Sequence, residues 1–172
     1  TLTDLMTVRE VAGNISGRTI VIGGDIFSNY SARSNCIGFT KLGAQVLIAG
    51  PMSLIPPGFE DIGATICPVD EAIRQGDVFL WHSATDETGP PIKGVSQPNI
   101  HPLFQLSDAS IPHMKKEAVV IHNGVCSERK KLAYQRNGIK ILDMLSQAGN
   151  GVAIRMALLY LIAGGNRGPT AY

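Results

Sequence analysis

The sequence predicts an α/β fold, a doubly wound parallel sheet of about five strands with helices on both faces, of the Rossmann-like type. Two observations lead to this prediction. Short and almost continuously apolar runs recur along the chain, and stretches compatible with helices separate them. Strands that helices cover on both faces show such continuous runs instead of alternating ones. The runs span residues 19–22, 45–49, 64–67, 78–81, 118–121 and 139–142.

Three segments predict helices that place the rest of the chain around this sheet. Residues 2–12 carry apolar side chains at helical spacing and stop before Gly13. After the first strand, a glycine turn leads into a helix expected over 31–42. The last predicted helix, 151–163, is apolar nearly all round. A helix of this kind normally lies in an interior, yet no later element is expected to cover it.

The composition predicts one domain that spans residues 1–172. Hydrophobic residues make up 44% of the chain and charged residues 17%, which argues against disorder. The formal net charge is +1 without a long basic run, so nucleic acid is not an expected partner. No apolar run approaches the roughly 18 residues that span a bilayer, so no membrane partner is expected. Three cysteines without a CxxC pair are typical of a cytoplasmic protein with reduced thiols.

His122 has the position that most suggests chemistry. It follows the strand predicted over 118–121, and ligands of open α/β sheets bind beyond the carboxyl ends of strands. The alternative is a hydrogen-bonded structural histidine. Cys126, four residues later, could act as a thiol nucleophile. No carboxylate is evident beside this pair, which favours a small apolar filler.

Two glycine-containing segments have structural interpretations. The Gly23-Gly24-Asp25 turn could suggest a dinucleotide-binding fingerprint, but a GxGxxG motif would need a glycine where Phe27 stands. A turn glycine of a βα unit is therefore favoured. Residues 82–101 contain glycines and prolines without periodicity, and they predict a long exposed loop that follows a strand.

Six stretches, taken together, resemble one protein family. They are TLTDLMTVREVAG, IVIGGDIFSNYSARSN, FTKLGAQVLIAGPMSLIPPGFEDIGA, VDEAIRQGDVFL, HMKKEAVVIHNG and NGVAIRMALLYLIAGG. In this order and spacing they resemble the aspartate and ornithine carbamoyltransferases, and specifically the amino-acid-binding domain of a bacterial aspartate carbamoyltransferase. The resemblance spans nearly the whole chain.

The resemblance implies one half of a two-domain transferase. In that family the first domain binds carbamoyl phosphate through a Ser-Thr-Arg-Thr loop, the second binds the amino-acid acceptor, and the active site lies between them. Only the second is recognised here, so the carbamoyl-phosphate domain is expected on a separate subunit, with a homo-oligomer as the alternative. The first and last helices would be the interdomain or subunit-contact elements. The family implies no metal or redox cofactor.

The resemblance also assigns candidate site residues. The family's GDxxxxRxxxS loop aligns with residues 24–34, and its acceptor-binding arginine falls at Tyr30. Its Arg-x-Gln motif aligns with Ser83 and Thr85. Its His-Pro-x-Pro motif aligns with residues 122–125, where only the histidine is kept. The implied catalytic residue is His122, and the implied substrate-binding residues are Tyr30, Arg33 (the nearby cation), Ser83, Thr85, Asn123 and Gly124.

The changed site leaves two functions open. The loss of two arginines removes the bidentate partners that a dicarboxylate needs, which predicts a different or more neutral acceptor. In the first hypothesis the chain is the acceptor-binding subunit of an aspartate carbamoyltransferase-like enzyme, which transfers a carbamoyl group from carbamoyl phosphate to a small amine or amino acid. In the alternative it is a non-catalytic or repurposed paralogue that acts as a structural or regulatory partner.

Overall fold

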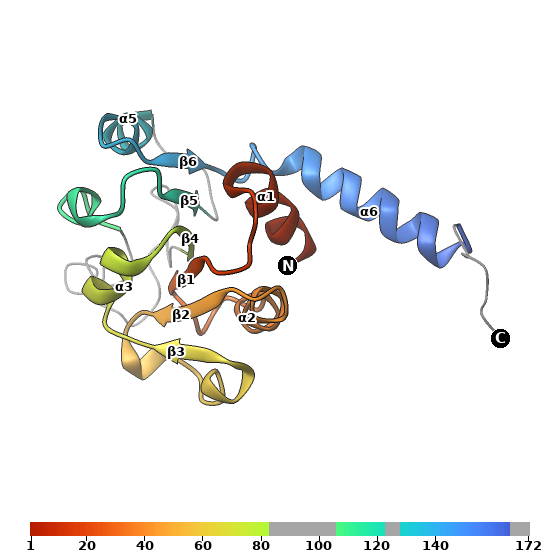
Figure 1. Ribbon diagram of the computed structural model, residues 1–172, viewed down its shortest axis with the longest axis horizontal. Helices are drawn as coiled ribbons and strands as arrows, with labels where there is room; N and C mark the ends of the chain where they lie inside the picture. The colour runs from red at the N-terminus through yellow and green to blue at the C-terminus, as the bar shows by residue number, and fades with distance from the viewer. Residues whose placement is uncertain (83–105, 123–127, 166–172) are drawn as a thin grey trace.

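The computed structural model describes residues 1–82, 106–122 and 128–165, which form a parallel sheet with flanking helices (Figure 1). These residues contribute six strands in the order β3-β2-β1-β4-β5-β6, and all neighbours pair in parallel. The strands are β1 (Thr19–Gly24), β2 (Gln45–Ala49), β3 (Ala64–Ile66), β4 (Val78–His82), β5 (Val119–His122) and β6 (Lys140–Leu142). The prediction of a doubly wound parallel sheet is confirmed.

Five α-helices and three short 3₁₀ turns accompany the strands in the described part of the chain. The helices are α1 (Leu2–Ala12), α2 (Ala32–Lys41), α3 (Val69–Gln75), α5 (Glu128–Arg136) and α6 (Ala148–Ile162). The 3₁₀ turns are η1 (Met52–Leu54), η2 (Glu60–Ile62) and η3 (Ile111–His113). The first helix has the predicted bounds, whereas the last begins three residues before the predicted 151. The predicted loop 82–101 lies outside the described residues, apart from His82.

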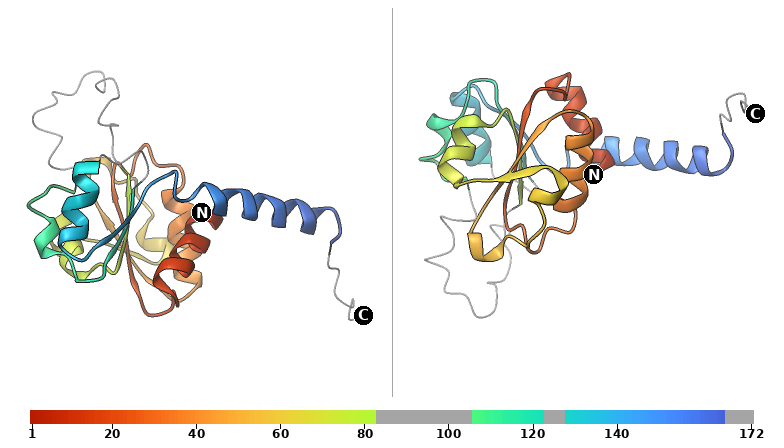
Figure 2. Two further views of the ribbon diagram at one scale, coloured as in Figure 1. Left: turned by 90° about the horizontal axis from the view of Figure 1, so that it is seen from above. Right: turned by 60° about the horizontal axis from the view of Figure 1, so that its bottom comes forward.

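The sheet has six strands, where about five were expected. Every apolar run forms a strand, including the two edge strands β3 and β6, which have only three residues each. Burial on both faces explains why the runs are continuous. In β1, Ile20 and Ile22 pack with α1 and α2 on one face, while Val21 packs with α3 and α5 on the other. Figure 2 shows the two helical layers on opposite sides of the sheet.

Helix α6 projects from the body of the domain (Figure 1). Its first turn is attached to α1, because the Nδ2 of Asn150 donates to the Oγ1 of Thr7 at 3.1 Å and to the Oε2 of Glu10 at 2.6 Å. Within α6 only Gly151 is buried. The exposed large apolar side chains of α6 are Val152, Met156, Leu158, Leu159, Tyr160, Leu161 and Ile162. The described residues therefore leave a long apolar helix uncovered.

In the part of the chain that the structure describes, no helix is both long and apolar enough to cross a membrane.

Candidate functional site

The strand order creates a topological switch point between β1 and β4. From β1 the chain continues to β2 and β3 on one side, and it then crosses to β4 on the other side of β1. In open α/β sheets, ligands bind in the crevice at the carboxyl ends of strands where the order reverses. The register places Gly24 beside His82 and Trp81 beside His122 at this edge. The candidate site is therefore the carboxyl edge of β1, β4 and β5.

Close packing at this edge explains the glycines that end β1. A Cβ on Gly23 would overlap the indole ring of Trp81, and a Cβ on Gly24 would overlap the carbonyl oxygen of His82. Gly24 also has a φ of 91°, which favours glycine. The next residue, Asp25, donates its backbone N–H to the His82 carbonyl at 2.9 Å and accepts the Ser28 N–H at 3.1 Å. The two glycines thus allow β1 and β4 to approach, as expected for a structural turn.

Three of the predicted site residues, Tyr30, Arg33 and His122, lie in the described part of the chain. His122 ends β5 and is buried. Tyr30 lies in the loop after β1 and is 99% exposed. Arg33 is exposed on α2, and its guanidinium lies beside Gly58, where an added Cβ would be 3.4 Å from Nη2. Gly58 belongs to the connection between β2 and β3, so the head group of Arg33 lies toward β2 and is not brought to His122. Ser83, Thr85, Asn123 and Gly124 lie outside the described residues.

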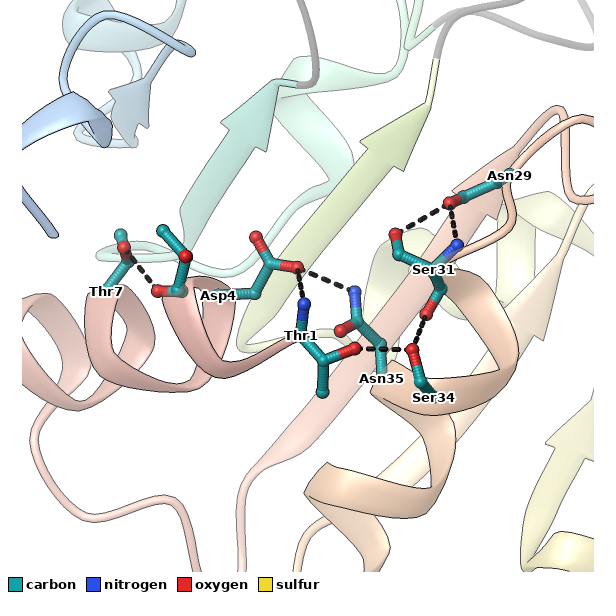
Figure 3. A network of polar contacts seen from close by, with 8 residues as sticks. Thr1, Asp4, Thr7, Asn29, Ser31, Ser34 and Asn35 are labelled. Carbon is teal, nitrogen blue, oxygen red and sulfur yellow. Dashed lines mark hydrogen bonds and ion pairs between the residues drawn. The ribbon is translucent and has the colours of Figure 1, made fainter. Parts of the chain in front are cut away.

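A small pocket opens between α1, α2 and the ends of β4 and β5. Its lining residues are Asp4, Asn29, Ser31, Asn35, Leu80, Trp81, His82 and Ile121. Figure 3 shows the polar network along one side of it, which connects α1 to α2. The Nδ2 of Asn35 donates to the Oδ2 of Asp4 at 2.9 Å, and the Oδ1 of Asn29 accepts from the Ser31 hydroxyl at 2.8 Å. Polar groups therefore converge at the switch point.

The sequence interpretation did not identify Asp4, Asn29 or Asn35 as site residues. One signal could have found Asn35. It lies on the face of α2 that also carries Ala32 and Phe39, so the helical pattern places an amide on a buried apolar face. Asn35 is only 3% exposed. A buried amide needs partners for both its donor and its acceptor atoms, which makes such a residue informative.

A second polar cluster lies at the end of β6. The carboxylate of Asp143 accepts the backbone N–H of Ser146 at 3.0 Å and its hydroxyl at 2.9 Å, and it is 3.1 Å from the Nζ of Lys131. The bond from the Ser146 N–H, helped by its hydroxyl and by Lys131, lowers the pKa of Asp143 to about 2 although burial opposes the shift. This cluster fixes the turn that leads into α6.

The described cysteines do not have the features of nucleophiles. Cys36 and Cys67 are free and buried, and burial raises the pKa of both thiols. Cys126, the alternative nucleophile beside His122, lies outside the described residues. Among the described His, Cys, Asp and Glu side chains, no group of three or more is arranged to hold a metal ion.

Known proteins that resemble the chain are carbamoyltransferases. No protein-family model matches it. The aspartate carbamoyltransferase catalytic subunit of Desulforapulum autotrophicum is 38% identical over 168 residues, which cover 97% of this chain and 54% of that subunit. The chain is thus similar to one part of this catalytic subunit. The corresponding subunit of Desulfosudis oleivorans is 36% identical over 167 residues, or 96% of this domain and 54% of the subunit.

Solved structures show that this domain has the carbamoyltransferase fold. Aspartate transcarbamoylase from Trypanosoma cruzi, in complex with carbamoyl aspartate and phosphate, matches with a TM-score of 0.68 at 18% identity. Ornithine carbamoyltransferase from Gloeobacter violaceus matches with a TM-score of 0.63 at 20% identity. These matches cover 92% and 91% of the domain and 53% and 55% of the solved chains. The domain spans about half the length of the curated relatives it matches.

Proposed function

We propose that this chain is the acceptor-binding subunit of an aspartate carbamoyltransferase-like enzyme. In the proposed reaction the nitrogen of an amine attacks the carbamoyl carbon of carbamoyl phosphate. A C–N bond forms, the C–O bond to phosphate breaks, phosphate leaves, and the amine gives up a proton. One observation carries this proposal: a relative that is an aspartate carbamoyltransferase catalytic subunit is 38% identical over 97% of the chain.

The proposed active site is the switch-point edge, completed by a second domain. His122 at the end of β5 is the proposed catalytic residue. Positioning of the two reactants and stabilisation of the developing negative charge would supply most of the catalysis. The proposed substrate-binding residues are Tyr30, Arg33, Ser83, Thr85, Asn123 and Gly124.

The proposed acceptor is a small amine or amino acid that is more neutral than aspartate. Tyr30 stands where the family places an acceptor-binding arginine, and the Arg33 guanidinium lies beside Gly58 instead of the switch point. Two carboxylates bound in a closed site need bidentate guanidinium partners. The pocket between α1 and α2 has no arginine or lysine among its lining residues. An acceptor with a second carboxylate would therefore be bound weakly at this edge.

The proposed partner is a separate subunit that binds carbamoyl phosphate and covers α6. Monomeric proteins rarely expose contiguous apolar patches of more than a few hundred Å², and larger ones usually mark an interaction site. Leu159 and Ile162 are 67% and 82% exposed. Self-association through the same helix is the alternative partner arrangement. The protein is proposed to work in the cytoplasm, where its thiols stay reduced.

A reconstituted transfer assay tests this function. The chain is co-expressed with a candidate subunit that carries the Ser-Thr-Arg-Thr loop, and phosphate release from carbamoyl phosphate is measured with a panel of amines, aspartate included. We expect turnover with at least one amine only when both subunits are present. A stable complex that carbamoylates no amine would overturn the enzymatic proposal and leave a non-catalytic, structural or regulatory role. The replaced arginine at Tyr30 is the observation that favours this second candidate.

A further inference from the structure

The buried amide of Asn35 has an acceptor atom without a donor. Its Nδ2 donates to Asp4, but within the described residues nothing donates to its Oδ1. Rotating the amide by 180° would not remove the problem, because it would point an oxygen at the Asp4 carboxylate. Asp4 therefore fixes the orientation of the amide and leaves Oδ1 as the unsatisfied acceptor. A buried acceptor without a donor is unfavourable, and native proteins usually supply a water or a ligand for it.

The surroundings of Asn35 favour a cationic donor. Asn35 and Asp4 both line the switch-point pocket, and the other polar lining residues are Asn29, Ser31 and His82. No lysine or arginine is among these described lining residues. The cation that the structure places beside the Asp4 carboxylate is the α-amino group of Thr1, 3.5 Å from Oδ2, so this carboxylate already attracts an ammonium group. The pocket volume is about 40 Å³, and a space of roughly 10–15 Å³ already admits one small polar group. The pocket thus has room for the head of a ligand but not for a whole amino acid.

We propose that this pocket is an ammonium-binding subsite, in which the Oδ1 of Asn35 and the carboxylate of Asp4 receive the amino head of a small primary amine. A primary ammonium has three N–H donors and one positive charge, which match an unsatisfied amide oxygen and a carboxylate. The inference rests on the proposed function in one respect, because that function requires an amine acceptor, whose bound ammonium form would give up a proton before its nitrogen attacks. It adds the subsite and the recognition of the amino end by Asn35 and Asp4.

Isothermal titration calorimetry provides a direct readout of binding, because the Trp81 ring packs in the cluster on the other face of the sheet although the residue lines the pocket. The full chain is titrated with methylammonium chloride at constant ionic strength while the heat of binding is recorded. Sodium chloride and tetramethylammonium chloride serve as control titrants, since the first has no N–H donor and the second has charge without a donor. We expect a saturable change with methylammonium and none with either control.

Three variants connect the signal to the subsite. Asn35→Leu removes the acceptor at nearly constant volume, and Asp4→Asn removes the charge. A hydrogen bond to a charged group is strong enough that losing it should weaken methylammonium binding by about tenfold or more in each variant. Ser34→Ala, an exposed neighbour on α2 outside the pocket, is the matched control and should bind like the wild type. If circular dichroism shows that Asn35→Leu does not fold, the methylammonium affinity of Asp4→Asn alone tests the subsite.

Two results would overturn the subsite. A wild-type chain that gives the same heats with methylammonium and sodium chloride would show that the pocket holds water only. Equal responses to methylammonium and tetramethylammonium would show that hydrogen-bond donors are not recognised. Both measurements use this chain alone, without carbamoyl phosphate or a partner. Failure of the subsite is therefore distinguishable from failure of the transfer reaction, which is scored only in the assembled complex.

Discussion

Gly23 lies against Trp81 so closely that the α-carbon of residue 23 has no room for a methyl group on that side. The contact joins the ends of β1 and β4 at the switch point. Trp81 is buried on the opposite side of the sheet from α1 and α2, in the cluster that includes Phe79 and Tyr134. The ring therefore cannot move aside without disturbing that cluster, and the geometry of the candidate site depends on a glycine.

Gly23→Ala is expected to destabilise the domain. The added methyl would overpack the Trp81 ring, and forcing extra carbon into a packed core typically lowers the free energy of unfolding by about 1–3 kcal/mol. Gly149→Ala is the matched control, because no atom lies within 4 Å of its added Cβ and the residue is in helix α6. Helix propensity predicts that the control is neutral or stabilising by about 0.5–1 kcal/mol. Urea unfolding followed by circular dichroism measures both, and equal midpoints would contradict the packing argument.

The packing of β1 also shows which parts of the fold could be predicted from sequence. Its apolar run was identifiable because Ile20 and Val21 are both buried although they point to opposite faces. The number of strands was less certain, since three-residue edge strands such as Lys140–Leu142 carry a weak pattern. The residues at which the strands end were therefore predicted well, and the proposal of a site at the carboxyl edge followed from them.

The details of the site could not be predicted in the same way. The direction of the Arg33 side chain depends on how α2 is rotated against the sheet and on where Gly58 lies. The local sequence pattern specifies neither the rotation of the helix nor the position of the loop. The pocket depends on a contact between Asp4 and Asn35, which are 31 residues apart in sequence and on different helices. The roles assigned to Ser83, Thr85, Asn123 and Gly124 stay predictions.

Asp143 is expected to make stability depend on pH in the acid range. Its pKa falls from 3.8 to about 2 on folding, so the folded state binds its proton less tightly than the unfolded state does. The stabilisation is therefore present above about pH 4 and is lost as the pH falls toward 2. Asp143→Asn should lower the free energy of unfolding at neutral pH by about 1–2 kcal/mol. It should also make the loss of stability between pH 4 and pH 2 smaller than in the wild type.

Asp108→Asn is the control for this pH dependence, because Asp108 is 66% exposed and its carboxylate lies 3.9 Å from the guanidinium of the exposed Arg129. The stability of this control variant should fall at acid pH as much as that of the wild type. Unfolding midpoints in denaturant, measured at pH 7, 4 and 3, provide the comparison. An Asp143→Asn chain with the same pH dependence as the wild type would show that the Ser146 and Lys131 contacts do not stabilise the carboxylate.

His122→Ala is expected to reduce carbamoyl transfer in the assembled complex. A positioned histidine contributes typically about 10²–10⁴-fold to a rate through proton transfer, so a loss of at least about a hundredfold in kcat is the expected result. His113→Ala is the control, because His113 is exposed on η3 and does not end a strand at the switch point. Phosphate release measures both rates. A variant with wild-type kcat would remove His122 from the proposed catalytic role.

Charge on α6 is expected to prevent assembly without unfolding the domain. Leu158 and Leu159 are 40% and 67% exposed, so Asp at both positions removes little buried surface from the isolated chain. In a complex the same side chains would be buried, and each contributes about 1.5–3 kcal/mol when fully removed from water. Two charges placed in that interface would also lack partners. The double substitution should therefore abolish association while the circular dichroism spectrum stays unchanged.

Leu132→Asp separates this effect from a general loss of surface hydrophobicity. Leu132 is 50% exposed on α5, and the helical layer of α3 and α5 lies across the sheet from α1 (Figure 2). Its substitution should leave association intact, because the proposed contact elements are α1 and α6. Sedimentation velocity at increasing protein concentration, with and without the candidate carbamoyl-phosphate subunit, measures the outcome. If the wild-type chain remained a monomer under both conditions, the exposed helix would not be a subunit contact, and the proposal that a partner covers it would fail.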